Sequence, residues 1–532
     1  MTGPSGVGMA ERRRGILGAA GLLAASVLMA RILGFVRDAL FAHNVGVGPA
    51  ADAYFAAFMI PDILGYLMAA GAAAVAVTPP YVKRLEREGP EAAARFASSV
   101  VGNVGAIATL ATVALWLGAE PLLRLQFGRF DEATLAETAR LMRIVLPAQI
   151  FFLVGGVLRG VLMAHGRFGP QAWASVVYSA APIGGGLLLA GADGFAWGTL
   201  AGAVIGQWAI PVLALRRLPG AVGRVRIAPF DPAFREYVWL ALPLMLGLGL
   251  TTVDEWYEKW VGGQIAEGAI ASITYARKLM MAPVGIVGQA VGAALLPTLT
   301  ALHERGDAAG FGALFTRTLR ATLGLGVMAG AALHVLGLPV VQVLYERGRF
   351  SAANSREVAA LLAVLACAVP AWVVQQVAVR GFYARGEMWR AMALSTAVAL
   401  AVFPLYLWGG SSGGVRGLAM ASAGAITLNA TITVVWLRLR CGAPDLAPLV
   451  ETFGRTALIA GAAALATRFA LERGAWLQDR PWLALFAGAA VYAGALAVTV
   501  PWLADAEVQR TLRALPGRLR RRAPAPADEA QR

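Results

Sequence analysis

The sequence predicts an all-α polytopic membrane protein with about fourteen transmembrane helices, two parallel six-helix lobes around a central cavity, and two additional C-terminal helices. Hydrophobic residues make up 58% of the 532 residues and charged residues only 14%, and the mean hydropathy is +0.64. A soluble domain carries closer to about 25% charged residues. The apolar residues also form blocks of roughly 20, the length that crosses about 30 Å of hydrocarbon as a helix. A soluble multidomain enzyme is therefore excluded.

The apolar blocks give the predicted spans directly. They are 15–42, 52–80, 92–117, 138–163, 170–190, 194–215, 234–260, 268–300, 311–336, 358–384, 388–409, 414–438, 448–470 and 481–504. The first block follows Arg12–Arg14 and carries Arg31, Arg37 and Asp38. A signal peptide has a short, uncharged apolar core, so we predict an uncleaved first helix.

Basic loops set the predicted orientation. They fall on one side of the membrane and comprise Arg12–Arg14, Lys83/Arg84/Arg87, Arg216/Arg217/Arg224/Arg226, Arg305/Arg317/Arg320, Arg385/Arg390, Arg438/Arg440 and the tail Arg510–Arg522. By the positive-inside rule, that side is cytoplasmic and holds both termini of a multi-pass protein. Topology thus explains the formal charge of +15, and no nucleic-acid partner is predicted.

Weak motifs recur at one offset. Pro80 and Pro297 each begin the pattern P-x-x-x-x-L-x-x-x-G, Gly128-Arg129-Phe130 recurs as Gly348-Arg349-Phe350, and Arg159-Gly160 recurs as Arg380-Gly381. Collinear matches at about 220 residues indicate a duplicated unit.

The duplicated unit predicts the domain organisation. The expected parts are an N-terminal six-helix lobe at 1–220, a C-terminal six-helix lobe at 221–440, two additional helices at 441–505 and a basic cytoplasmic tail at 506–532. Six helices return the chain to its starting side, so the copies should run parallel. Transporters with such lobes hold substrate in a central cavity and rock around it; packing alone is the alternative reason for the repeat.

Charges within the first helix are the first candidate site. An ionisable residue near the bilayer centre costs about 2.5–3.5 kcal/mol on insertion scales, so it usually faces a cavity or a partner. Arg31 lies about 24 Å along the helix from residue 15 and shares a face with Asp38, with Gly34 between them. Arg37 and Asp38 lie nearer the outer end, where snorkelling to water is the alternative.

Two further acidic positions begin or end helices. Asp52 opens the second helix, where it is expected to cap that helix, and a cap there is compatible with a role in gating. Asp254, near the end of the seventh helix, is a candidate cation site, and reaching water at the outer interface is the alternative. Glu255 and Lys259 in the same helix have the i,i+4 spacing of an ion pair.

The eighth helix carries Arg277 and Lys278 about one third of the way across, where orientation does not explain them. We predict that both face the cavity. Pro283 and the glycines after it should let the helix bend. Cations of both lobes would then meet in one space suited to a diphosphate, because guanidinium groups bind phosphate oxygens bidentately and Lys adds a point charge.

Several segments resemble the MurJ (MviN) family of lipid II flippases. The opening segment Arg31-Ile-Leu-Gly-Phe-Val-Arg37-Asp38, followed by Gly46-Val-Gly48 and Asp52-Ala-Tyr-Phe, is similar to the start of that family. Further similar segments are Tyr275-Ala276-Arg277-Lys278-Leu279 with Pro283, Leu296-Pro297, Tyr345–Phe350 and Gly381-Phe382-Tyr383-Ala384. The resemblance covers nearly the whole chain.

The resemblance implies a fold of the multidrug/oligosaccharidyl-lipid/polysaccharide exporter superfamily with a cationic cavity. It implies that lipid II, the undecaprenyl-diphosphate-linked peptidoglycan precursor, moves from the inner to the outer leaflet by alternating access. Arg31, Arg37, Arg277 and Lys278 would contact substrate. Gating or structural roles would fall to Asp38, Asp52, Gly34 and Pro283. Membrane lipids and the cell-wall synthesis machinery would be further partners.

The chain departs from the family pattern in three places. Gly65-Tyr66 stands where the second helix usually carries an arginine pair. Arg277 stands where an acidic residue is common, so it would restore a lost positive charge. Some family members bind sodium through the seventh, eleventh and twelfth helices, and the predicted eleventh helix has no Asp or Asn. A flippase for another lipid-linked glycan therefore remains an alternative.

Other functions are less well supported. A drug/cation antiporter of the same superfamily would need an acidic ion site in the cavity rather than cations. A membrane glycosyltransferase acting on a lipid carrier would need catalytic carboxylates, and the longest loops carry no such pair. No catalytic residue is predicted, so the chain is expected to be a transporter and not an enzyme. Two cysteines and four scattered histidines give no metal site. No cofactor is expected and no G-x-x-x-x-G-K-[ST] motif occurs; coupling to Na⁺ or H⁺ stays open.

Overall fold

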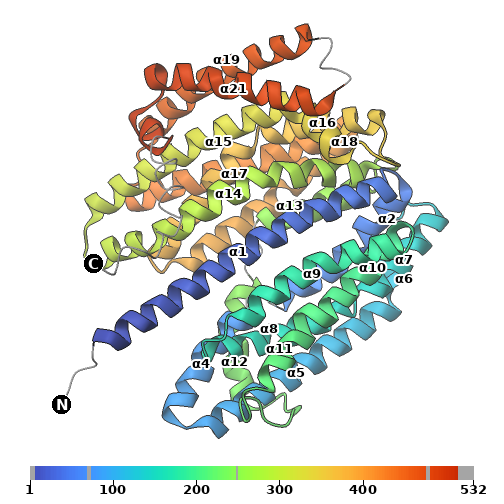
Figure 1. The fold of residues 1–532 in the computed structure, drawn as a ribbon, viewed down its shortest axis with the longest axis vertical. Helices are drawn as coiled ribbons and strands as arrows, with labels where there is room; N and C mark the ends of the chain where they lie inside the picture. The colour runs from blue at the N-terminus through green and yellow to red at the C-terminus, as the bar shows by residue number, and fades with distance from the viewer. Residues whose placement is uncertain (1–5, 69–72, 247–249, 475–479, 513–532) are drawn as a thin grey trace, which may run out of the picture. The chain divides into compact units, whose positions relative to one another are not determined.

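The computed structural model describes residues 6–68, 73–246, 250–474 and 480–512, and this part of the chain consists of helices joined by short loops (Figure 1). The chain forms two compact units. Unit 1 comprises Met1–Gly247, Gly262–Ala271 and Tyr345–Ser351, and unit 2 comprises Leu248–Val261, Ser272–Leu344 and Ala352–Arg532. Unit 1 therefore includes two segments from the second half of the chain.

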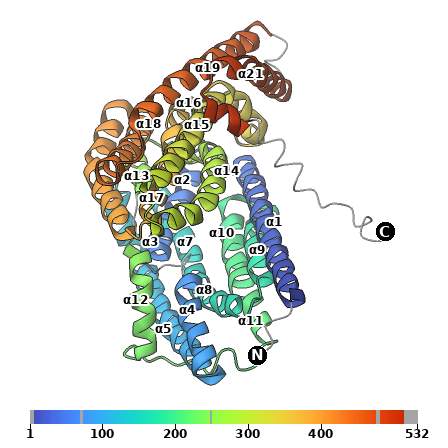
Figure 2. The same cartoon turned by 90° about the vertical axis from the view of Figure 1, so that its left-hand side faces the viewer.

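Unit 1 is built around a long first helix and shorter, often interrupted helices. In order these are α1 (Gly6–Asn44), α2 (Pro49–Ala57), α3 (Met59–Leu67), α4 (Ala73–Arg87), α5 (Pro90–Leu117), α6 (Ala119–Gln126), α7 (Glu132–Val145), α8 (Ala148–Ala164), α9 (Gly169–Leu188), α10 (Gly191–Gly202), the π-helix η1 (Ala203–Ala209), α11 (Ile210–Leu215) and α12 (Pro232–Leu246). Helix α1 packs along α9, and α9 along α10 (Figure 2).

Small residues allow the close packing of α9 and α10. A Cβ atom added to Gly185 would lie 2.0 Å from the carbonyl oxygen of Gly194, and one added to Gly198 would lie 2.6 Å from that of Ala181. Helices in membranes pack through such small-residue contacts because lipid offers little hydrophobic drive for association. The apolar core of unit 1 lies mainly among α4, α5, α8 and α12, and the side chains of Phe96, Leu153 and Val157 are fully enclosed in it.

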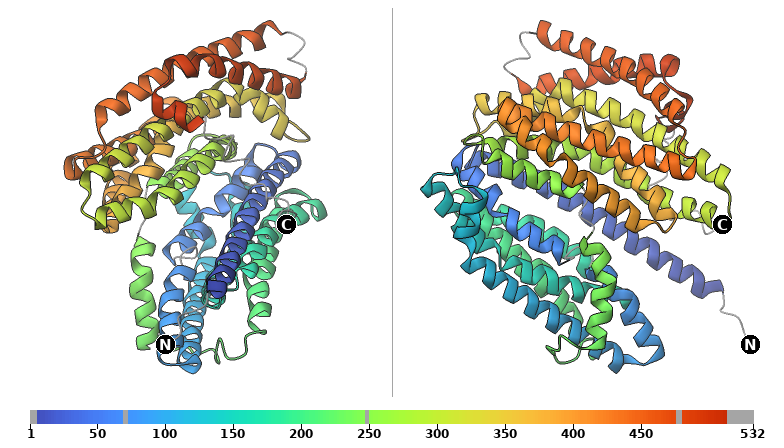
Figure 3. Two further views of the ribbon diagram at one scale, coloured as in Figure 1. Left: turned by 60° about the vertical axis from the view of Figure 1, so that its left-hand side comes forward. Right: turned by 180° about the vertical axis from the view of Figure 1, so that it is seen from behind.

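Unit 2 contains eight described helices or the larger part of them. These are α13 (Leu250–Gly262), α14 (Ala269–Glu304), α15 (Ala308–Tyr345), α16 (Ala352–Ala366), α17 (Val369–Ala384), α18 (Met388–Cys441), α19 (Leu446–Arg473) and α21 (Pro481–Leu503). The first residues of α14 and the last of α13 belong to unit 1. Helix α18 is interrupted at Gly414, where φ is 58° and ψ is −145°. Helices α19 and α21 lie side by side (Figures 1 and 3).

The predicted all-α polytopic fold is confirmed, since the described residues of each predicted span lie in one helix or in consecutive helices. Residues 69–72 of the predicted span 52–80 and residues 247–249 of the predicted span 234–260 lie outside the described residues. Seven of the described helical stretches are long and apolar enough to cross a membrane, or eight if α16 and α17, bent by 46°, form one span. The two predicted spans 388–409 and 414–438 are the halves of α18 on either side of Gly414. The predicted lobe boundaries at residues 220, 440 and 505 stay predictions.

Candidate functional site

Two charged residues of α1, Arg37 and Asp38, form an ion pair in unit 1. Nε and Nη2 of Arg37 donate to Oδ1 of Asp38 at 3.1 and 3.0 Å. The Asp38 side chain is 8% exposed and that of Arg37 is 31% exposed, so the carboxylate is enclosed while the arginine side chain is partly exposed. Arg31 is half-buried. A Cβ atom added to Gly34 would meet no atom within 4 Å, so helix packing does not require glycine at this position.

Asp52 in the first turn of α2 is 1% exposed and binds another helix. Its Oδ2 accepts from the backbone N–H of Gly268 at 2.6 Å, and its Oδ1 accepts from that of Ala271 at 2.7 Å. These are N–H groups at the N-terminus of α14, which have no partner inside that helix. The expectation that Asp52 caps its own helix is wrong, because the N-cap of α2 is Gly48. The carboxylate caps α14, and its gating role stays a prediction.

The first Gly-Arg-Phe segment, Gly128–Phe130, packs on the loop between α13 and α14. Nη1 of Arg129 donates to the carbonyl oxygen of Gln264 at 2.7 Å. The ring of Phe130 stacks on that of Phe127 with centroids 5.0 Å apart. A Cβ atom at Gly263 would lie 2.6 Å from the Phe127 ring, so glycine is required there.

The second Gly-Arg-Phe segment, Gly348–Phe350, makes the corresponding contact with the end of α1. The backbone N–H of Arg349 donates to the carbonyl oxygen of His43 at 3.0 Å. Gly348 has φ of 60°, and a Cβ atom there would lie 2.4 Å from the same oxygen. A Cβ atom at Gly46 would lie 2.7 Å from the carbonyl oxygen of Arg349. Each copy of the motif thus contacts the loop that follows the first helix of the other copy, and all four segments belong to unit 1.

A buried ion-pair cluster lies in unit 2, formed by Asp254 and Glu258 of α13 with Arg277 of α14. Nε of Arg277 donates to Oε2 of Glu258 at 2.5 Å, and its Nη2 donates to Oδ2 of Asp254. Residues Asp254, Glu258 and Arg277 are 0%, 1% and 6% exposed. We call these three side chains the Arg277 cluster.

Residues of α17 and α18, which come much later in the sequence, surround the three side chains of the Arg277 cluster. From α18, the Tyr406 hydroxyl donates to Oδ1 of Asp254, and the Ser422 hydroxyl donates to its Oδ2 at 3.2 Å. From α17, the ring of Trp372 lies with its centroid 5.9 Å from Cζ of Arg277, within cation–π range. Both carboxylate oxygens of Asp254 therefore already have donors from three residues of unit 2.

The two cations of α14 that the sequence predicts to face a cavity lie in different environments. Arg277 is enclosed with two carboxylates, whereas its neighbour Lys278 is half-buried. Pro283 lies inside α14, as predicted. The i,i+4 pair of Glu255 and Lys259 is confirmed, with 2.8 Å between Oε1 and Nζ. The predictions that Arg277 contacts substrate and that Asp254 binds a cation stay predictions.

Sequence reasoning missed Glu258, Tyr406, Ser422 and Trp372 as members of one site. Glu258 was detectable, because it follows Asp254 by four residues and so lies on the same face of a helix. Tyr406 and Ser422 carry no such signal, since they lie about 150 residues further along in apolar stretches that resemble ordinary membrane helices.

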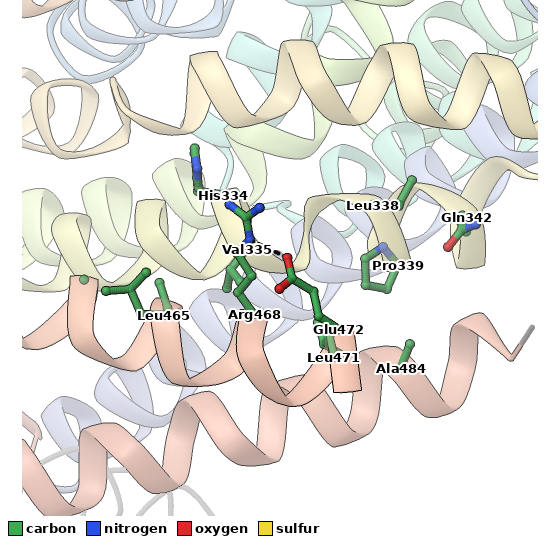
Figure 4. Close-up of a pocket in the computed structure, with 12 residues that line it drawn as sticks. His334, Val335, Leu338, Pro339, Gln342, Leu465, Arg468, Leu471, Glu472 and Ala484 are labelled. Atoms are coloured by element: carbon green, nitrogen blue, oxygen red, sulfur yellow. Dashed lines mark hydrogen bonds and ion pairs between the residues drawn. The ribbon is translucent and has the colours of Figure 1, made fainter. Parts of the chain in front are cut away.

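A separate cavity of about 720 Å³ lies on unit 2 among α15, α19 and α21. Figure 4 shows His334, Leu338 and Pro339 on one side and Arg468 and Glu472 on the other. Nε of Arg468 donates to Oε1 of Glu472 at 2.7 Å, so the cation in this cavity is already paired. None of the residues predicted from the sequence lines it.

Comparisons with known proteins agree with this architecture. Residues 41–478 match the model of the family described as lipid II flippase MurJ. A probable lipid II flippase MurJ of Rhizobium tropici is 31% identical over 437 residues, which cover 78% of this chain and 79% of the relative. A solved lipid II flippase MurJ in an inward closed conformation superposes with a TM-score of 0.73 at 20% identity, covering 90% of this chain and 99% of that one. An inward-facing multidrug resistance MATE family transporter of the MOP superfamily gives a TM-score of 0.67 at 15% identity, covering 77% and 94%.

The all-helical polytopic fold of the described residues, with charges held inside its helices, defines a multi-pass membrane protein. The two matches to solved structures establish that fold. The match over most of the chain defines the group more narrowly: the chain belongs to the MurJ family of lipid II flippases.

Proposed function

We propose that this protein moves lipid II from the inner to the outer leaflet of a bacterial inner membrane by alternating access. The observation that carries the proposal is the family match over residues 41–478. The charged segment of α1 adds physical support, because Arg31, Arg37 and Asp38 lie in the apolar part of this helix, beyond the charged residues near its start. An antiporter or a lipid-carrier glycosyltransferase is not favoured by the family match.

The basic side chains inside the membrane helices are suited to the negative charge of a lipid-linked diphosphate. A lipid-linked diphosphate carries negative charge and strongly hydrated oxygens, so its headgroup does not cross hydrocarbon unaided. Arg31, Arg37 and Lys278 are each half-buried. In the proposed mechanism each of these side chains contacts the anionic headgroup during transport, while the polyprenyl tail stays in the bilayer. Arg277 acts inside unit 2, where it neutralises carboxylates of α13.

Conformational change requires helices that bend and a cap that opens. Gly34 has free space around its Cα, and Pro283 removes one backbone hydrogen bond from α14. In the proposed cycle α1 and α14 bend near these residues. Asp52 holds the N-terminus of α14 in one state and releases it in the other, which gives this residue its gating role.

The Arg277 cluster bears on whether sodium binding at Asp254 drives transport. The guanidinium of Arg277 donates to Asp254 and Glu258 directly, so it occupies the position at Asp254 where a diffusible cation would bind. We propose that flipping does not depend on sodium at Asp254. Flipping assays in proteoliposomes with Na⁺ and with K⁺ should give equal rates, and a rate that requires Na⁺ would contradict this proposal.

Complementation of a bacterium depleted of its MurJ tests the function. In the proposed function both termini lie in the cytoplasm. The cell-wall synthesis machinery then uses the lipid II that has reached the outer leaflet. The wild-type chain should restore growth, while Arg31→Ala and Lys278→Ala should not, although both reach the membrane in normal amounts. Arg217→Ala is the control, because Arg217 is an exposed residue after α11.

Each outcome separates the parts of the proposal. Failure of a well-expressed wild-type chain would favour another lipid-linked glycan as substrate. Growth with either the Arg31 or the Lys278 variant would remove the binding role of that residue while leaving the transported substrate unchanged.

A further inference from the structure

Arg159 is a buried cation of unit 1 to which the proposed mechanism gives no task. It lies in α8, five residues before the helix ends at Ala164, which corresponds to about 7.5 Å of helix rise. The residue is 8% exposed. A buried ionisable residue inside a membrane helix marks a functional site unless a partner neutralises it.

The contacts of Arg159 use only one edge of the guanidinium. Its Nη1 donates to the carbonyl oxygen of Gln207 at 3.4 Å and to Oε1 of the same residue. Gln207 belongs to the π-helix η1. Gly155, one turn before Arg159, permits this approach, because a Cβ atom there would lie 1.8 Å from the Gln207 carbonyl oxygen. Short π-helical segments often occur at functional sites, and this one presents both Gln207 oxygens to the cation.

The charge of Arg159 is not neutralised within the described part of the chain. No carboxylate pairs with it, and its Nε and Nη2 donate no hydrogen bond to any described residue. Two other arginines in the described helices differ, because the buried Arg277 contacts two carboxylates and the half-buried Arg37 contacts Asp38. The Nε and Nη2 edge is the one with which a guanidinium binds two oxygens of a phosphate or carboxylate side by side.

The repeat supplies an internal comparison. Arg380, the counterpart of Arg159 in the second copy, is half-buried, and its Nε donates to the carbonyl oxygen of Gln376 one turn earlier in the same helix. Only the first copy buries this arginine against a second helix. Duplication and helix packing therefore do not by themselves explain the environment of Arg159.

We propose that Arg159, oriented by Gln207, is an oxyanion-binding site of unit 1 that takes a phosphate or carboxylate group through its Nε and Nη2 edge. The proposal rests on the proposed function for the source of that group, which is the anionic part of a lipid-linked substrate. A free phosphate would satisfy the same chemistry, so the experiment separates the two sources.

The experiment measures equilibrium binding to the full-length protein in nanodiscs of a zwitterionic lipid. The probes are undecaprenyl diphosphate and inorganic pyrophosphate. The first variant is Arg159→Gln. The second is Gln207→Glu, which places a carboxylate beside Nη1 and neutralises the cation without removing it. Arg380→Gln is the matched control from the second copy.

Arg159→Gln and Gln207→Glu should each weaken binding of undecaprenyl diphosphate about tenfold or more, because a charge-assisted pair of hydrogen bonds is lost or neutralised. Arg380→Gln should bind like the wild type. If Arg159 only held η1 in place, Gln207→Glu would preserve that contact and leave binding unchanged, and this result would overturn the proposal even if Arg159→Gln failed to fold.

The two probes distinguish this inference from the proposed function. Arg159-dependent binding of both probes supports the oxyanion site. Arg159-dependent binding of pyrophosphate by a chain that does not restore growth would support the site while contradicting the lipid II substrate. Binding of both probes with wild-type affinity by the folded Gln207→Glu variant would contradict the site whatever the chain transports.

Discussion

At the scale of single residues, the Arg277 cluster shows how strongly buried charges depend on each other. Arg277→Met would leave Asp254 and Glu258 enclosed without their cation. Removing one partner of a buried ion pair costs about 3–5 kcal/mol, because an uncompensated charge stays in a medium of low polarity. We expect a clearly lower apparent melting temperature for the purified variant in detergent, measured by the fluorescence of the tryptophans.

A triple variant controls for the loss of packing. Asp254→Asn, Glu258→Gln and Arg277→Met together remove all three charges, and the triple variant should be more stable than Arg277→Met alone, since residues of one network are not additive. A triple variant less stable than the single one would show that the cluster is held by shape rather than by charge.

The site was only partly predictable from the sequence at this scale. The pair of Glu255 and Lys259 followed from spacing alone, because residues four apart meet on a helix. The partners of Asp254 did not, since Tyr406 and Ser422 come from the two halves of α18 and no local pattern links them to α13. Asp52 was singled out correctly, but the helix that it caps begins more than 200 residues later.

At the scale of elements, the cap that Asp52 provides for α14 gives a second prediction. Asp52→Asn keeps the shape of the side chain but removes its charge and one of its two acceptor oxygens. Loss of a helix N-cap costs about 0.5–2 kcal/mol, and the charge adds to this at a helix N-terminus. We expect slower flipping and faster labelling of a cysteine placed at Gln264 by a water-soluble maleimide.

Asp307→Asn is the matched control for the cap. Oδ1 of Asp307 accepts from the backbone N–H of Gly310 at 2.7 Å at the start of α15, so this substitution also removes a capping carboxylate. It should leave labelling at Gln264 unchanged. Equal labelling in the Asp52 and Asp307 variants would argue against a gating role for Asp52.

The second Gly-Arg-Phe segment gives a third prediction. Gly348→Ala puts a Cβ atom 2.4 Å from the carbonyl oxygen of His43 at a φ of 60°, so the loop must move away from the end of α1. Gly306→Ala meets the same kind of backbone, with φ of 69°, but its Cβ atom has no neighbour within 4 Å. The control should cost only the backbone strain of about 1 kcal/mol.

The measurement for both glycine variants is the apparent melting temperature together with growth in the complementation assay. Gly348→Ala should lower both and Gly306→Ala should lower the melting temperature slightly. Equal effects of the two substitutions would mean that backbone strain alone, and not the contact with α1, accounts for the result.

The elements themselves were largely predictable, because each apolar block of membrane length became a helix or a run of helices. The interruptions were not. The π-helix η1 and the break at Gly414 arise where chain segments approach each other closely, as in the contacts of Gly155 with Gln207 and of Gly409 with Gly417. Such approaches depend on tertiary packing, and a hydropathy pattern carries no information about them.

At the scale of the whole molecule, the duplication predicts which loops share a side of the membrane. Glycine contacts recur in both units, since a Cβ atom at Gly185 would meet the carbonyl oxygen of Gly194 at 2.0 Å and one at Gly409 would meet that of Gly417 at 2.6 Å. These pairs lie about 220 residues apart, as the sequence motifs do. Two copies of six helices run parallel, whereas copies with an odd number would be inverted.

Single-cysteine labelling tests the parallel arrangement in a chain in which Cys367 and Cys441, the two cysteines of the sequence, are changed to serine. Glu88 and Asp307 are exposed residues that follow equivalent helices of the two copies, and Glu267 is an exposed residue between α13 and α14. A membrane-impermeant maleimide added to spheroplasts should label Glu267→Cys at once. It should label Glu88→Cys and Asp307→Cys only after the membrane is permeabilised. Six helices separate the copies, so labelling of Glu88→Cys and Asp307→Cys from opposite sides of the membrane would contradict a parallel duplication. Labelling of both residues from outside would contradict the proposed orientation of the chain.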